Sequence, residues 1–137
     1  MASSMETATT ITSEIRAWLM RELRFPVMAT IGKDAMPKLS VIWFDLDPDR
    51  DDVVLLNTLA GRVKDRQLRR DPRVSLCFED GTEYVTVEGR AELFDDREKA
   101  MANIWAMAHR YGQGEGSFAM GDRVDIVVHV ERVIRHR

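Results

Sequence analysis

The sequence predicts a mainly β protein, built as a small antiparallel β-barrel with helices packed outside it. Most apolar segments have the length and the alternation of β-strands. They are joined mainly by turns and hairpins rather than by helical crossovers, and Asp80-Gly81 is the strongest hairpin signal. Six such strands with two or three helices fit a closed barrel better than an open sheet, because closure removes exposed strand edges.

The predicted strands cover residues 27–31, 38–46, 53–58, 73–79, 82–94 and 122–134. The second half of the strand at 38–46 is apolar on both faces, which predicts that it packs on both. Residues 32–35 form a turn, residues 47–52 an acidic loop, and residues 112–121, with four glycines, a mobile loop.

Three helices are predicted from capping and spacing signals. The first is capped by Thr12 or Ser13 and closed by Pro26. Its expected buried face is Ile15, Trp18, Leu19 and Leu23. A short basic helix covers residues 62–70. Asp95 caps the third helix, with Glu98 completing a capping box. The expected buried face of the third helix is Met101, Ile104, Trp105, Ala108 and Tyr111.

The length of 137 residues predicts a flexible tail over residues 1–11 and one domain over residues 12–137. A net charge of −3 argues against a nucleic-acid-binding protein. The first residues lack the pattern of a signal peptide, and no apolar run is long enough to span a membrane, so we expect a cytoplasmic protein. The single cysteine, Cys77, excludes an internal disulfide and is expected to be a buried, inert thiol.

The sharpest chemical feature is the run from Asn57 to Lys64. Asn57 and Thr58 end a strand, Gly61 allows a turn, and Arg62 and Lys64 lie in the first turn of the basic helix. The helix dipole disfavours cations there, so the pair needs an anion, and phosphate would suit both the helix N–H groups and the side chains. From composition alone a solvated basic face, an anion site and a nucleic-acid contact all stay open. The spacing is not that of a P-loop.

Several motifs together resemble one family. They are Ala29-Thr30-Ile31-Gly32 with Pro37, then Val41-Ile42-Trp43-Phe44, then Leu56-Asn57-Thr58 followed by Gly61-Arg62, Lys64, Leu68 and Asp71-Pro72-Arg73-Val74, and finally Tyr84 to Ala91. In order and spacing they resemble the deazaflavin-dependent reductase branch of the pyridoxamine-phosphate-oxidase-like superfamily. The resemblance extends from Ile15 to Val133.

This resemblance implies an antiparallel FMN-binding split β-barrel, and a homodimer with two cofactor sites at the dimer interface. It implies that Arg62 and Lys64 hold the cofactor phosphate with help from Thr58. Asn57 and the segment Val41, Ile42 and Trp43 would lie near the tricyclic ring, and Gly61 belongs to the same cofactor-binding set. Tyr84, Trp105 and Tyr111 are candidates to complete the site from the partner chain, although core packing is expected for Trp105.

The implied cofactor is coenzyme F-420, a 5-deazaflavin that donates hydride to an acceptor. FMN is the alternative, since the oxidases proper use it. The chain ends at Arg135-His136-Arg137 and lacks the Arg-Leu-x-Pro type of ending of those oxidases. A flavin-binding protein without turnover is a third possibility. The cofactor supplies hydride chemistry, so we expect no catalytic side chains, and no cluster has metal-ligand spacing.

Overall fold

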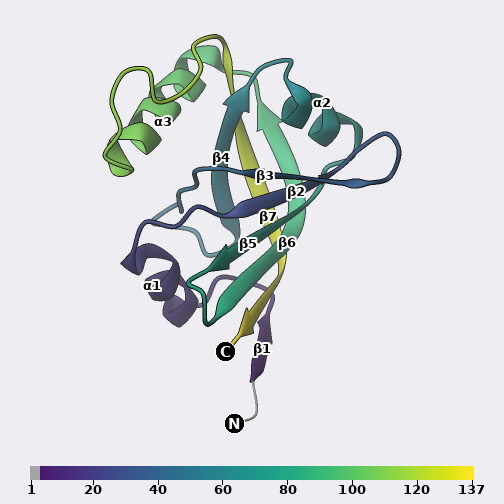
Figure 1. The fold of residues 1–137 in the computed structure, drawn as a ribbon, viewed down its shortest axis with the longest axis vertical. Helices are drawn as coiled ribbons and strands as arrows, with labels where there is room; N and C mark the ends of the chain where they lie inside the picture. The colour runs from purple at the N-terminus through teal and green to yellow at the C-terminus, as the bar shows by residue number, and fades with distance from the viewer. Residues whose placement is uncertain (1–3) are drawn as a thin grey trace.

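The computed structural model describes residues 4–137 and confirms a mainly β, antiparallel architecture (Figure 1). A seven-stranded sheet runs in the order β1-β7-β6-β5-β2-β3, with β4 paired to β7 as well. Three helices lie outside this sheet. The strands are β1 Met5–Ala8, β2 Val27–Ile31, β3 Pro37–Val41, β4 Val53–Leu59, β5 Arg73–Glu79, β6 Tyr84–Phe94 and β7 Arg123–His136. The helices are α1 Ser13–Arg21, α2 Val63–Arg70 and α3 Arg97–Arg110.

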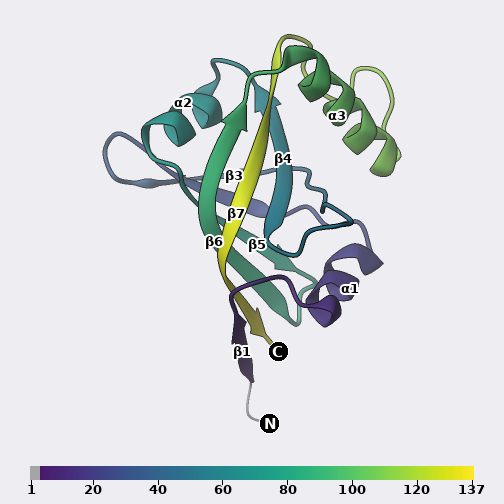
Figure 2. The ribbon, with the colours of Figure 1, turned by 180° about the vertical axis from the view of Figure 1, so that it is seen from behind.

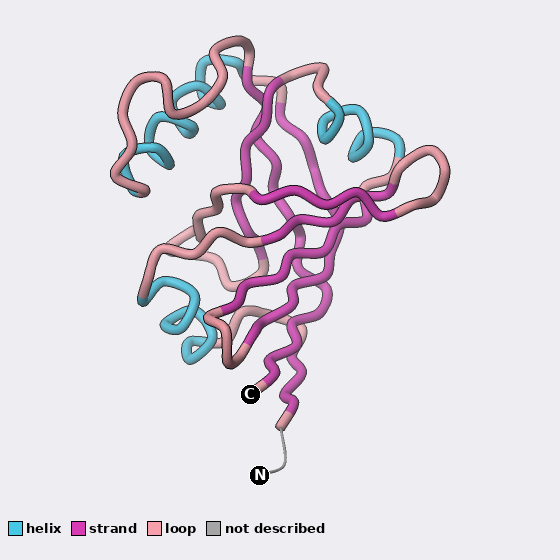
Figure 3. Tube along the Cα trace, viewed as in Figure 1, coloured by secondary structure: helices cyan, strands magenta, loops and turns pink. Residues whose placement is uncertain are grey.

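The sheet curls into a barrel because its two ends meet. Asp45, in the segment after β3, exchanges backbone hydrogen bonds of 3.0 and 2.9 Å with Leu55 of β4. The helices cover the ends of the barrel, with α1 near the chain termini and α2 and α3 at the opposite end (Figures 2 and 3). Alternate strand residues fill the interior, as period-2 patterning requires. Fully buried members of this core include Met28, Phe44, Leu56, Leu76, Phe78, Val85, Val87, Ile126 and Val128.

The helix boundaries follow their capping signals closely. The Thr12 hydroxyl accepts a hydrogen bond of 3.3 Å from the Ile15 amide at the start of α1. The cap of α3 is Asp96, which accepts from the Lys99 amide at 3.1 Å. The prediction of Asp95 as this cap is therefore wrong by one residue, because Asp95 instead pairs with Arg69 at 2.6 Å.

Two predicted core residues are exposed. Leu23 lies beyond the end of α1 and is 48% exposed. Trp105 is 37% exposed and packs edge-on against Phe118, with ring centroids 4.9 Å apart. The core packing predicted for Trp105 is wrong, because the buried stripe of α3 is rotated from the predicted one. That stripe consists of Ala100, Ile104, Met107 and Ala108.

The strand predicted over residues 38–46 is shorter than expected. It ends at Val41, and the chain then runs irregularly to Asp45. In the second half of this segment Phe44 and Leu46 are buried. In the amphipathic first half Leu39 and Val41 are 68% and 64% exposed, so the apolar face of that half is not covered within this chain. The reason is topological, since β3 is an edge strand with one neighbour in this chain.

The flexible tail predicted for residues 1–11 is wrong where the structure describes it. Met5–Ala8 forms β1, which pairs antiparallel with the end of β7, and Ile11 is 1% exposed within the core. The side chains of Arg135, in β7, and of Arg137, just after it, donate to the Glu14 carboxylate at 3.0 and 3.1 Å, which holds α1 against this end of the sheet. Residues 1–3 lie outside the described part of the chain.

Among residues 4–137, no helix is both long enough and apolar enough to cross a membrane.

Of the glycines in the described chain, Gly89 leaves the least room for a side chain. It lies at a β-bulge between β6 and β7, where an added Cβ would fall 2.1 Å from the His129 carbonyl oxygen. We predict that Gly89→Ala lowers the free energy of unfolding in urea by about 1–3 kcal/mol, because backbone must shift to accommodate the methyl group. Gly114→Ala is the control, since a Cβ there meets nothing within 4 Å. Equal stability of the two variants would contradict the prediction.

Candidate functional site

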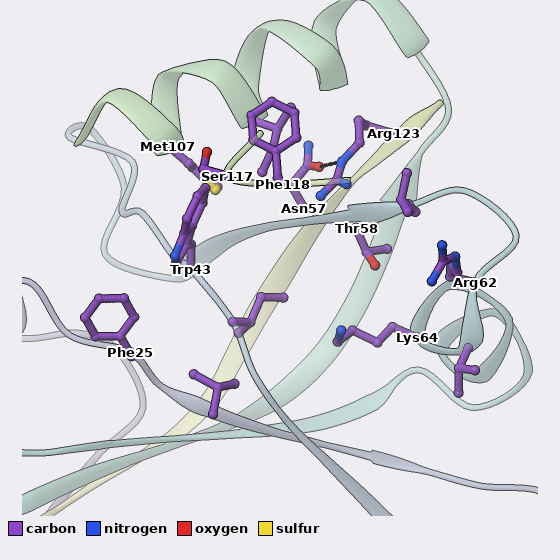
Figure 4. Close-up of a pocket in the computed structure, with 15 residues that line it drawn as sticks. Phe25, Trp43, Asn57, Thr58, Arg62, Lys64, Met107, Ser117, Phe118 and Arg123 are labelled. Atoms are coloured by element: carbon purple, nitrogen blue, oxygen red, sulfur yellow. Dashed lines mark hydrogen bonds between the residues drawn. The ribbon is translucent and has the colours of Figure 1, made fainter. Parts of the chain in front are cut away.

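A cleft of about 440 Å³ opens where β4 ends, between α2, α3 and the segment that follows β3 (Figure 4). Its volume is in the range of small-molecule sites. The lining residues are Phe25, Val41, Ile42, Trp43, Asn57, Thr58, Leu59, Arg62, Val63, Lys64, Ile104, Met107, Ser117, Phe118 and Arg123. Arg62 and Lys64 lie toward α2, Arg123 lies beside Asn57 and Phe118, and Phe25 and Trp43 lie at the other end (Figure 4).

The predicted site residues come together here, apart from Gly61. Val41, Ile42, Trp43, Asn57, Thr58, Arg62 and Lys64 all line the cleft. Gly61 lies outside it and has a φ of 76°, which explains why a glycine is needed at the turn before α2. Its N–H donates to the Asp65 carboxylate at 2.6 Å and is not open to a ligand.

The Asn57 side chain is buried, and both its amide nitrogen and its amide oxygen are hydrogen-bonded within the chain. Its amide nitrogen donates to the Ala100 carbonyl of α3 at 2.9 Å and to the Asp125 carboxylate at 3.0 Å. Its amide oxygen accepts from Arg123 Nε at 2.8 Å (Figure 4). Asn57 was predicted to lie near a cofactor ring, and its place in the cleft wall is compatible with that. Its hydrogen bonds, however, are used to hold Arg123.

The amino end of α2 is not capped by a side chain. Arg62 occupies the N-cap position and makes no capping hydrogen bond. The one acidic residue of the first turn, Asp65, turns away to Gly61 and to Arg69 Nε, at 2.6 Å each. The first N–H groups of α2 are thus left without a side-chain acceptor, next to Arg62 and Lys64, and a helix end in this state attracts anions.

Three cations line the cleft, and none of its described lining residues is Asp or Glu. Burial is the main cause that lowers the pKa of Lys64, and repulsion from Arg123 and Arg62 lowers it further. Burial also lowers the pKa of Arg123, which is 7% exposed. Neither Arg62, Lys64 nor Arg123 forms a salt bridge within the described chain. Like charges gathered at a partly buried surface without a counter-charge favour binding of an anion.

The other end of the cleft is aromatic and apolar. Trp43 stacks on Tyr111, with centroids 5.2 Å apart and planes inclined by 13°. The Tyr111 hydroxyl donates to the Arg24 carbonyl at 2.5 Å, which fixes the tyrosine behind Trp43. Tyr111 is therefore a packing residue in this chain. In the cleft wall, the Ser117 hydroxyl is buried without a hydrogen-bond partner among the described residues, which leaves it available to a ligand.

Sequence reasoning missed six lining residues that matter to this shape: Phe25, Ile104, Met107, Ser117, Phe118 and Arg123. Ser117 and Phe118 belong to the glycine-rich loop, whose path has no periodic signal. Arg123 lies opposite Leu59 in the β4–β7 pairing. Knowledge of that pairing would have identified Arg123, but it joins segments 64 residues apart.

Residues 11–137 match the protein-family model described as pyridoxamine 5'-phosphate oxidase. Among solved structures, the chain is similar to an F-420 reductase, with 24% identity, TM-score 0.73, and 85% of this chain and 94% of that chain covered. A conserved hypothetical protein from Mycobacterium tuberculosis shares 28% identity, TM-score 0.68, with 92% and 85% covered. A FAD-binding protein from Mesorhizobium loti shares 18% identity, TM-score 0.67, with 97% and 98% covered.

The charge crowding in the cleft predicts that Lys64→Met makes the ligand-free protein more stable. The folded state depresses the Lys64 pKa below its ordinary value of 10.5, so at neutral pH the charged lysine opposes folding. We expect Lys64→Met to raise Tm by roughly 2–4 °C at pH 7. The gain should shrink as pH rises toward 10.5 and vanish above it, where the lysine has lost its proton in both the folded and the unfolded state.

Lys33→Met, at an exposed position on the β2–β3 turn, is the matched control for this measurement and should leave Tm within about 1 °C. Thermal unfolding followed by circular dichroism measures both variants. A lower Tm for Lys64→Met than for the unchanged protein would show that Lys64 is not under electrostatic strain.

Proposed function

Because this chain belongs to the pyridoxamine 5'-phosphate oxidase family, we propose that it is an oxidoreductase that binds coenzyme F-420 and transfers hydride between it and a small unsaturated molecule. One observation carries the proposal: a single cleft joins a cationic, carboxylate-free end to an aromatic end. A phosphorylated tricyclic cofactor has the matching pair of chemistries. The similarity to an F-420 reductase supports the deazaflavin over FMN, which stays the alternative.

The cationic end fits a cofactor phosphate. Arg62 offers a planar fork of N–H donors, and Lys64 reaches from α2 toward the middle of the cleft (Figure 4). The Thr58 side chain lines the same wall, and its hydroxyl makes no hydrogen bond with the described residues. With the free N–H groups of α2, these donors can saturate phosphate oxygens without rearranging the barrel.

The aromatic end fits the ring of such a cofactor. Trp43 is held flat by Tyr111, so a planar ring can pack beside it at little cost in side-chain entropy. Ile42 and Met107 add apolar walls that exclude water. When bound, the cofactor supplies the hydride-transfer chemistry itself. The role of this chain is then to hold and orient the ring and to keep the site dry, which requires no catalytic side chain.

A homodimer is part of the proposal. Leu39 and Val41 of the edge strand β3 are 68% and 64% exposed, and Val41 also lines the cleft. A second copy packed on this strand would bury the two side chains and close the aromatic end. This arrangement would account for the apolar pattern of residues 38–46, which a single chain leaves unexplained.

Replacing both phosphate-binding cations tests the site. We predict that Arg62→Ala with Lys64→Ala weakens cofactor binding by about 2–5 kcal/mol, because each charge-assisted contact contributes roughly 1.5–3 kcal/mol and the two are not additive. Fluorescence titration with coenzyme F-420 and with FMN measures the change. The matched control is Lys33→Ala with Arg66→Ala, which removes the same charges from exposed positions. Unchanged affinity in the first variant would place the phosphate elsewhere.

The same titrations separate the candidate functions. Tight binding of FMN with no binding of coenzyme F-420 would exclude the deazaflavin and favour an FMN-dependent oxidoreductase. Binding of either cofactor without its oxidation by a panel of quinone, nitro and enone acceptors would favour a flavin-binding protein without turnover.

A further inference from the structure

Arg123 is a buried cation whose charge nothing in the described chain neutralises. Its side chain uses Nε for the Asn57 amide oxygen at 2.8 Å and Nη1 for the Ala119 carbonyl at 3.2 Å. Both acceptors are neutral. Because an unpaired buried charge is expensive, structures normally place a carboxylate beside an arginine in such a position.

The carboxylate closest in this network is kept away from Arg123. Asp125 accepts from Asn57 Nδ2 at 3.0 Å and from Asn103 Nδ2 at 2.7 Å, and it forms no salt bridge with Arg123. Asn57 thus stands between the two charges. This arrangement orients the guanidinium through a neutral amide and leaves its other N–H groups for a partner in the cleft.

A single phosphate does not use all the charge in this cleft. A phosphate monoester carries about −1.5 to −2 at neutral pH, and a diester carries one charge. At the cationic end of the cleft, the charges of Arg62 and Lys64 and the free N–H groups of α2 already match that charge. Lys64 senses the charges of both Arg62 and Arg123, so the three cations share one electrostatic environment.

We infer that Arg123 binds a second anionic group of the same ligand, so that the cleft selects a ligand with two ionised groups in tandem over one with a single phosphate. The inference rests on the proposed function, whose phosphate site it extends. A diphosphate and a phosphate followed by a carboxylate share this chemistry. FAD provides the first, coenzyme F-420 the second, and FMN has only one phosphate.

Inorganic probes test the charge requirement without any ring. Pyrophosphate should raise the Tm of the unchanged protein more than orthophosphate at equal concentration and ionic strength. Arg123→Gln, which removes the charge but keeps an N–H donor for Asn57, should abolish that difference. Arg123→Lys, which keeps the charge, should retain part of it. Arg66→Gln, on the exposed side of α2, should leave the difference between pyrophosphate and orthophosphate unchanged. No pyrophosphate preference in the unchanged protein would overturn the inference.

Fluorescence titrations with FMN, FAD and coenzyme F-420 complete the test. Arg123→Gln should weaken binding of FAD or of coenzyme F-420 by about tenfold or more, and binding of FMN by less than about threefold. The ligand whose affinity falls more in Arg123→Gln, FAD or coenzyme F-420, is the one that provides the second anion. Equal losses for all three ligands would mean that Arg123 acts only through the structure of the cleft, and would overturn the inference.

The two proposals fail in different ways. If no flavin or deazaflavin binds while pyrophosphate still stabilises the protein through Arg123, the proposed function is wrong and the two-anion site stands. If flavin-type cofactors bind with affinities that Arg123→Gln does not change, the proposed function stands and the role of Arg123 is wrong.

Discussion

The antiparallel pairing of β4 with β7 is the contact on which the rest of this site depends. Its register sets Asn57 opposite Asp125, Thr58 opposite Val124 and Leu59 opposite Arg123. A slip of one residue would turn every side chain of β4 to the other face of the sheet. The strand would then present Leu56 where Asn57 now bridges Arg123, and the cleft would lose its polar wall. The buried residues on the inner face, Leu56 and Ile126 among them, hold the register in place.

Asn57 joins three elements with one amide group. It ties β4 to α3 through Ala100 and to β7 through both Asp125 and Arg123. An aspartate at this position would neutralise Arg123 directly, and an apolar residue would leave several buried polar groups without partners. The amide is the one side chain of this size that donates to a carboxylate and accepts from a guanidinium at once. The electrostatic character of the cleft therefore depends on a neutral residue.

The sequence predicted the barrel class, and most of the residues that its family resemblance singled out line the cleft. Much of this rests on local signals. Strand alternation, the Asp80-Gly81 hairpin and the turn at Gly61 act within a few residues, and the run from Asn57 to Lys64 is contiguous. Arg123 could not be found in this way, because its place depends on pairing across most of the chain. Trp105 was misassigned since α3 carries apolar residues on several faces, and only packing decides which one is buried. Leu39 and Val41 follow a buried-strand pattern yet lie at an edge.

The central position of β7 has a consequence for how the protein is made. This strand pairs with β1, β4 and β6, and it is formed by residues 123–136. During synthesis the strands that precede β7 emerge first, and their edges stay unpaired until residues 123–136 are available. Such edges are prone to associate with other chains. The barrel therefore closes only once residues 123–136 are available to pair with the strands that precede them.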